Sequence, residues 1–163
     1  MTPLGRALRA LVVLAAALAL GLGASAASAA TTVPWATKAT SEMGTAISAL
    51  PDGSAIVTGN FQGSATFATS PPTTLTSNGD SDIFVAKMGA SGSWQWAAKA
   101  GGAVTGDAGY GLGVSVLADG SAIVTGNFKG SATFATSPPT TLTSTGGADD
   151  IFVAKISASG VWQ

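Results

Sequence analysis

The sequence predicts an all-β fold built from two tandem copies of one antiparallel unit. The first observation is an internal repeat: residues 52–77 and residues 119–144 are identical except that Lys129 replaces Gln62. The second is that apolar residues fall in short runs bounded by turn signals, and the third is that no segment after the first thirty residues keeps a helical period. Self-similarity of this length indicates one structural unit that is copied and stacked.

The second copy predicts its strands in chain order. Residues 113–117 alternate apolar and polar side chains, and Asp119-Gly120 then gives a hairpin turn, because the central positions of such a turn need positive φ. Residues 121–128 follow as a strand with β-branched side chains, and residues 131–134 form a short one.

The second half of that copy continues the pattern. Prolines at 138 and 139 interrupt the ladder because proline donates no hydrogen bond, and residues 140–144 are extended again. Residues 151–156 form the strongest strand, and a last strand carries Trp162. The match between copies resumes here after one inserted residue, with residues 82–87 repeated at 150–155.

The strand predicted at residues 83–88 is apolar on both faces. Phe84 and Ala86 point to one face, whereas Ile83 and Val85 point to the other. A sheet with one wet face would alternate cleanly between apolar and polar residues. We therefore expect both faces to be covered, as in small sheets that stack face to face.

The first thirty residues have the layout of a helical secretory signal peptide. Arg6 and Arg9 precede an apolar run from Ala10 to Leu22, and small residues with cleavage points after Ala26 or Ala29 follow. A membrane anchor is the alternative, but the run is shorter than the roughly 20 residues that span a bilayer. The chain is therefore expected to be secreted or held at the cell surface, with no membrane span after cleavage.

Without that segment the composition excludes several classes of function. Lysines are the remaining cations and are outnumbered by the 8 acidic residues, and the whole chain has no histidine or cysteine. An arginine-free, weakly acidic surface is a poor match for nucleic acid, which needs clustered cations. The usual imidazole base and thiol nucleophile are missing, so the sequence predicts no enzyme activity and no cofactor.

Carboxylates are the remaining candidates for chemistry. A pair of them could hydrolyse glycosides, and residues 78–82 alternate oxygen ligands like the start of a calcium loop, without its closing glutamate. The favoured interpretation is that these aspartates cap turns in loops, and neither a catalytic nor a metal site is predicted. The aspartates concerned are Asp80, Asp82, Asp107, Asp149 and Asp150.

The combined motifs resemble the bacterial β-propeller repeat family known as SBBP. The resemblance rests on the D-G turn, the V-T-G strand, the D-I-F-V-A-K strand, an A-S-G-x-W turn, and W-A ending in G-G, over about residues 33–163. It implies four-stranded blades arranged radially, about two of them here, as a partial β-propeller. On that basis the chain divides into a signal peptide (1–30), a first blade (31–96) and a second blade truncated at its last strand (97–163).

The truncated blade has two explanations. Either the chain is incomplete and further blades are missing, or the N-terminal residues 33–38 complete the last blade of the same or a neighbouring chain. In both cases apolar faces at Phe84, Phe152 and Trp162 are expected to lack a neighbour, and open edges favour self-association.

The repeated aromatic and glycine positions are expected to pack between blades. Trp94 and Trp96 are expected on one face of their strand, because the side-chain period is two. Loops at residues 101–111 and 70–74 would carry recognition. The structural positions are Trp35, Trp96, Gly59, Gly126, Phe61, Phe128, Phe84, Phe152, Trp94 and Trp162.

The sequence therefore predicts a non-catalytic binding or adhesion scaffold outside the cell, whose partner is an extracellular protein or glycan. A structural spacer array without a ligand, and a fragment of a propeller hydrolase or lyase, are the alternatives.

Overall fold

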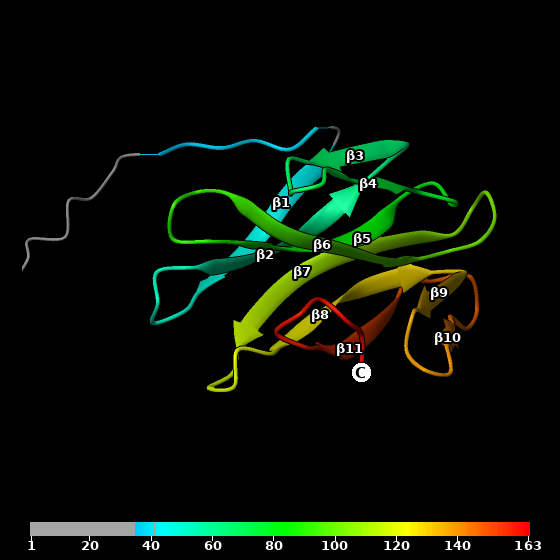
Figure 1. The fold of residues 1–163 in the computed structure, drawn as a ribbon. Coiled ribbons are helices and arrows are strands. Elements are labelled where there is room, and N and C mark those ends of the chain that lie inside the picture. Colours follow the sequence, from blue (N-terminus) through cyan, green and yellow to red (C-terminus); the bar gives the residue numbers. More distant parts are fainter. Residues whose placement is uncertain (1–34, 41) are drawn as a thin grey trace, which may run out of the picture. The chain divides into compact units, whose positions relative to one another are not determined.

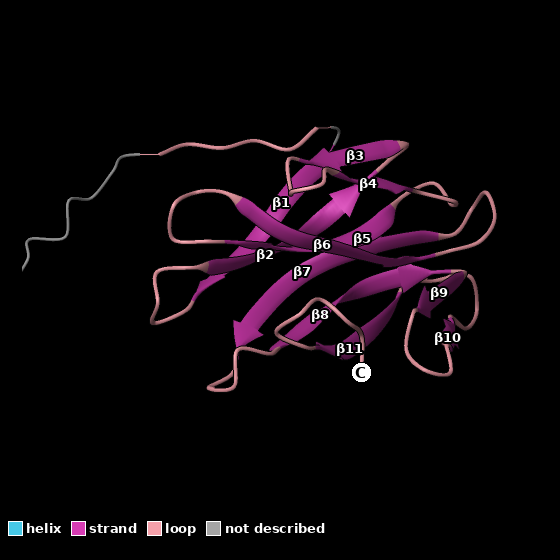
Figure 2. Ribbon diagram, viewed as in Figure 1, coloured by secondary structure: helices cyan, strands magenta, loops and turns pink. Residues whose placement is uncertain are grey.

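The computed structural model describes residues 35–40 and 42–163, and every element in that part of the chain is a strand or a loop (Figure 2). The all-β prediction is thereby confirmed, and the strand pairs of the sheets are antiparallel. The predicted signal peptide lies outside the described residues. Across the described residues no helix is present that could cross a membrane.

The strands fall into two series with the same order (Figure 1). Those of the first repeat are β1 (Glu42–Ala49), β2 (Ala55–Phe61), β3 (Ser64–Phe67), β4 (Thr73–Thr76), β5 (Asp82–Met88) and β6 (Trp94–Gly101). Those of the second are β7 (Ala108–Val116), β8 (Ala122–Lys129), β9 (Ser131–Phe134), β10 (Thr140–Thr143) and β11 (Asp150–Ile156).

The first repeat is a four-stranded meander with a hairpin inserted in it. β1, β2, β5 and β6 pair in that order, and β3 pairs only with β4, as a separate two-stranded sheet. The turn between β1 and β2 contains Gly53 at φ 81°, the left-handed conformation that glycine adopts without a steric cost. Asp52 fixes this turn by accepting a hydrogen bond from the Ser54 backbone N–H at 2.8 Å.

The second repeat has the same pairing as far as its strands extend. β7, β8 and β11 pair in the order of β1, β2 and β5, and Trp162 adds one bridge to Ile156. The hairpin β9–β10 joins the sheet of the first repeat, because Ala100 and Gly101 of β6 pair with Phe134 and Thr133.

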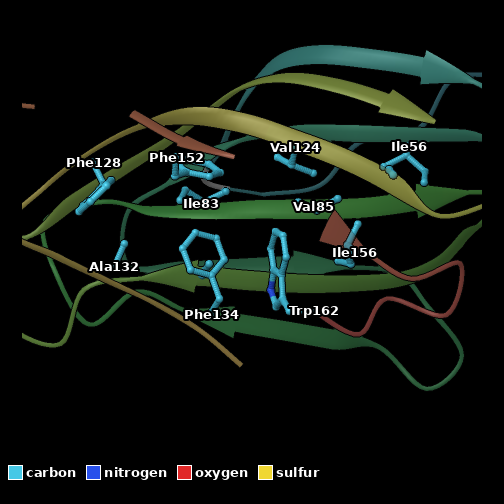
Figure 3. Close-up of a cluster of buried hydrophobic side chains, with 12 residues drawn as sticks. Ile56, Ile83, Val85, Val124, Phe128, Ala132, Phe134, Phe152, Ile156 and Trp162 are labelled. Carbon is cyan, nitrogen blue, oxygen red and sulfur yellow. The ribbon is translucent and has the colours of Figure 1, made fainter. Parts of the chain in front are cut away.

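The strand β5 is apolar on both faces, as the sequence predicts. On one face, Ile83 and Val85 pack into a core shared with the second repeat, which contributes Val124 and Phe152 (Figure 3). On the other face, Phe84 and Ala86 pack under the hairpin β3–β4 in a second core. Burial on both sides explains why this strand lacks the alternation of a sheet with one wet face.

A β-bulge makes the prediction for Trp94 and Trp96 wrong. Trp94 pairs with Met88 and Trp96 pairs with Lys87, so Gln95 is an extra residue in β6. One extra residue reverses the alternation of side chains beyond it. Trp94 therefore packs in the core under β3–β4, whereas Trp96 packs against the core shared by the two repeats.

The two predicted loops are shorter than expected. β7 begins at Ala108, because its first residues lie against the first repeat: the Gly109 N–H donates to the Ser81 carbonyl at 2.7 Å. Only residues 102–107 are left as a loop there. In the other loop, Thr73 and Thr74 belong to β4.

Candidate functional site

Each repeat builds the same aromatic cluster from its hairpin, its fifth strand and the tryptophan after it. In the first, Phe67 lies 5.5 Å from Phe84 and 5.1 Å from Trp94, measured between ring centroids. In the second, Phe134 lies 5.3 Å from Phe152 and 5.1 Å from Trp162. Both tryptophans meet the phenylalanine edge to face, a favourable geometry for aromatic rings.

This packing corrects the expectation that Phe84, Phe152 and Trp162 lack a neighbour. All three side chains are buried. The hairpin inserted in each repeat covers the face on which these residues lie, and the sequence pattern did not place that hairpin.

Gly59 and Gly126 each allow a close approach of backbone. A Cβ at Gly59 would overlap the carbonyl oxygen of Met43, and a Cβ at Gly126 would overlap that of Tyr110. Both glycines lie opposite a bulge in the preceding strand. Two residues further along each strand lies Phe61 or Phe128, and both are buried.

Trp35 and Trp96 bind equivalent turns. The Trp35 indole N–H donates to the Ala90 carbonyl at 3.1 Å, and the Trp96 indole N–H donates to the Ala158 carbonyl at 3.0 Å. Each ring covers a glycine of that turn, Gly92 or Gly160, where a Cβ would come within 2.6 to 2.8 Å of the ring. Residues near the N-terminus thus contact the first repeat as β6 contacts the second.

Two of the aspartates named as candidates for chemistry are buried and make structural bonds. Asp82 is fully buried and pairs with Lys99 at 3.0 Å. Asp107 is buried and accepts hydrogen bonds from the Ser131 hydroxyl at 2.7 Å and from the Ala103 N–H at 3.1 Å. The Ser131 hydroxyl bond holds the pKa of Asp107 below its usual 3.8.

The other three candidates lie nearer the surface. Asp149 accepts from the Asn127 side chain at 3.2 Å, and Asp150 accepts from the Thr145 N–H at 3.1 Å. Asp80 is exposed. Within residues 35–40 and 42–163, no three acidic side chains gather closely enough to form a group that could hold a metal ion.

Two aspartates in the hairpin turns have lowered pKa values. Bonds from the Ser54 hydroxyl lower the pKa of Asp52, and bonds from the Ser121 hydroxyl lower that of Asp119. The hydroxyl-to-carboxylate distance is 2.5 Å in both turns. These carboxylates stabilise turns, and the bonds that lower their pKa come from the hydroxyl and the backbone N–H of the serine two residues away.

The most unusual surface is the outer face of the second repeat, by which we mean the side of β11 that carries Ile151 and Val153. These side chains are 81% and 68% exposed, whereas their counterparts Ile83 and Val85 in the first repeat are 0% exposed. Sequence reasoning did not single them out. The available signal was the two-sided apolar pattern of the strand itself, since such a strand needs cover on both faces.

A hollow lies beside this face, and we call it the edge groove. It has a volume of about 120 Å³ and runs between β11 and the hairpin β9–β10. Its apolar lining includes Leu142, Ala154 and Trp162. These exposed apolar side chains beside a groove make the outer face a candidate binding surface.

Comparisons of the chain with known protein families, with curated proteins and with solved structures found no match.

Proposed function

We propose that the chain is a non-catalytic repeat scaffold of the β-propeller type, exported to the cell surface or beyond, which binds other macromolecules there. The observation that carries the proposal is the contrast between its carboxylates and its outer face. Two of the aspartates that could do chemistry are buried and held by structural bonds, Asp107 by hydrogen bonds in its loop and Asp82 by an ion pair, while two large apolar side chains face solvent on β11.

The blade-like character is supported by strand order. Four strands pair as a meander in the first repeat, and the second repeat follows the same order through β11 and Trp162. Export is supported by the basic, apolar and small-residue segments at residues 1–30.

A structural array is the second candidate function. It is favoured by the contact between the repeats, because the same tryptophan-to-turn bond occurs twice along the chain. Such an array would need only its own copies as partners.

Binding can be tested with the exported chain on an array of immobilised glycans and extracellular matrix proteins. We expect retention on at least one surface, reduced in the Val153→Asp variant, with Val104→Asp in the exposed loop 102–107 as a matched control. An array that stays blank would reject the binding function. Turnover of a glycoside or ester substrate that is lost in Asp149→Asn or Asp150→Asn would reject the non-catalytic one.

A further inference from the structure

The contact between the two repeats shows how one repeat receives the next. Strand β6 pairs with β5 along one edge, and it also touches the second repeat. The Trp96 indole donates to the Ala158 carbonyl at 3.0 Å, and in return the Trp162 indole donates to the Lys99 carbonyl at 2.9 Å. A fourth strand therefore completes its own repeat and binds the following one.

Residues 35–40 make the same contacts with the first repeat. Besides the Trp35 bond to Ala90, the Trp94 indole donates to the Lys38 carbonyl at 3.4 Å. The Thr66 N–H donates to the Thr40 hydroxyl at 3.2 Å, where the second repeat pairs Thr133 with Gly101. This segment has the sequence W-A-T-K-A, against W-A-A-K-A in β6. It therefore occupies the position that the fourth strand of a preceding repeat would take.

The second repeat has room for such a strand. Among the described residues, β11 pairs with β8 on one edge. On the other edge it has the Trp162 bridge and a hydrogen bond from the Gln163 N–H to the Lys155 carbonyl at 3.0 Å, and the rest of that edge is open. In the first repeat that place is taken by β6, whose Ala97 packs against the core that contains Leu75 and Ala86. The counterparts of those two residues, Leu142 and Ala154, line the edge groove instead.

We propose that copies of this chain associate head to tail, with residues 35–40 of one copy adding as the fourth strand along β11 of another. The pairing of β6 with β5 gives the register: Trp35 opposite Lys155, Ala36 opposite Ala154, and Lys38 opposite Phe152. The first repeat of the incoming copy then covers Ile151 and Val153, as the second repeat covers Ile83 and Val85.

Apolar side chains are exposed at both ends of the chain where this contact needs them. Val114 of β7 packs against the core shared by the two repeats. Its counterpart in β1 is Ile47, which is 63% exposed. Within the chain, Val114 and Val85 pack into one core. Their exposed counterparts are Ile47 and Val153, which the proposed contact brings together from two copies.

Charge complementarity points to the same occupant. Within the chain, Lys99 of β6 forms the 3.0 Å ion pair with Asp82 at the start of β5. In the proposed register, Lys38 of the second copy takes the place of Lys99, and Asp150 takes the place of Asp82. Asp150 has no ion-pair partner among residues 35–40 and 42–163, and the Lys38 side chain is exposed.

This contact joins two different surfaces, so it generates a ring or a filament rather than a symmetric dimer. It deepens the proposed function by naming the partner of the outer face, and it rests on that proposal only in taking this face as a binding surface.

The test is sedimentation of the chain recovered after export from an expressing host, over about 1 to 200 µM. We expect the mean mass to rise with concentration. Lys38→Glu and Asp150→Lys should each weaken association about tenfold or more, because each places like charges opposite one another. The double variant should associate again. An equimolar mixture of the two single variants should also associate again, with the two variants alternating, because both of its mixed junctions join opposite charges and only junctions between copies of one variant repel.

Lys129→Glu is the matched control, since Lys129 and its counterpart Gln62 are both exposed. It should associate like the unsubstituted chain. A monomer at every concentration, or association that ignores both charge reversals, would overturn the proposal. Self-association together with a blank glycan and matrix array would uphold this inference and reject the binding function. Retention on the array by a chain that stays monomeric would uphold the binding function and reject this inference.

Discussion

Ile83 and Ile151 occupy the same position in two strands that differ only at their last residue, yet their surroundings are opposite. The first is 0% exposed and the second 81%. Local sequence cannot account for this difference, because the neighbouring residues within the two strands are the same. Burial here is decided by tertiary contact: the apolar face of the second repeat covers Ile83, and no described residue covers Ile151 in the same way.

The largest effect is expected from truncating the two isoleucines in parallel. Ile83→Ala should lower the free energy of unfolding by about 2–5 kcal/mol, because it removes buried methyl groups and leaves a cavity. Ile151→Ala should change it by about 0.5 kcal/mol or less, since the side chain is exposed. Urea unfolding at low protein concentration measures both. Equal losses would show that β11 is covered in the isolated chain.

Much of the fold could be predicted from this sequence because most strands and turns occur twice, once in each copy of the repeat. The hairpin turns at Asp52 and Asp119, the two-sided strand and the absence of helix from the described residues all followed from turn chemistry and side-chain period. These are local signals, and the same local signal appears twice.

Predictions were wrong at the positions where tertiary contacts override the local sequence pattern. One extra residue at Gln95 separates Trp94 and Trp96 onto opposite faces, and a bulge leaves no compositional mark. The start of β7 has a glycine-rich, loop-like sequence, but it is a strand because its glycines allow close packing on the first repeat.

The outer face of the second repeat was not predicted as a site, although an open strand edge in that repeat was. The sequence predicted an open edge at the second repeat, but the exposed residues were assigned to the wrong face. Phe152 and Trp162 are buried under their own hairpin, and the exposed residues are Ile151 and Val153. The sequence could not show on which side the hairpin β9–β10 lies.

A smaller effect on stability is expected from substituting Lys99 of β6 and its counterpart Lys38 in residues 35–40. Lys99→Met leaves the carboxylate of Asp82 buried without its ion pair and should destabilise the chain by about 2 kcal/mol. This is less than for a fully buried pair, because Lys99 is partly exposed. Lys38→Met should leave the stability of the dilute chain within about 0.5 kcal/mol. Thermal melts at low and high concentration separate the two effects, and a large loss for dilute Lys38→Met would contradict the comparison.

The smallest effect is on the stability of the chain in acid. It depends on Asp107, which lies in the loop at residues 102–107. Because the folded pKa of Asp107 is lowered, its contribution to stability is present above the unfolded pKa of about 3.9 and is lost as the pH falls through the folded value. Asp107→Asn should therefore lose less stability between pH 6 and pH 3 than the unsubstituted chain. Urea midpoints at the two pH values test this, and an unchanged difference would remove Asp107 from the acid response.

The second repeat exposes along β11 the positions that the first repeat buries along β5, and we propose that a second copy pairs there in the register of β6 on β5. Site-directed cross-linking tests it most directly, since the chain has no cysteine of its own. A chain with Ala36→Cys and a chain with Ala154→Cys, mixed and oxidised, should form a disulfide-linked dimer, because opposite residues on paired strands lie within reach of a disulfide. Ala36→Cys mixed with Ser137→Cys, an exposed position on the hairpin loop, should not. Equal cross-linking of both mixtures, or none in either, would contradict the account.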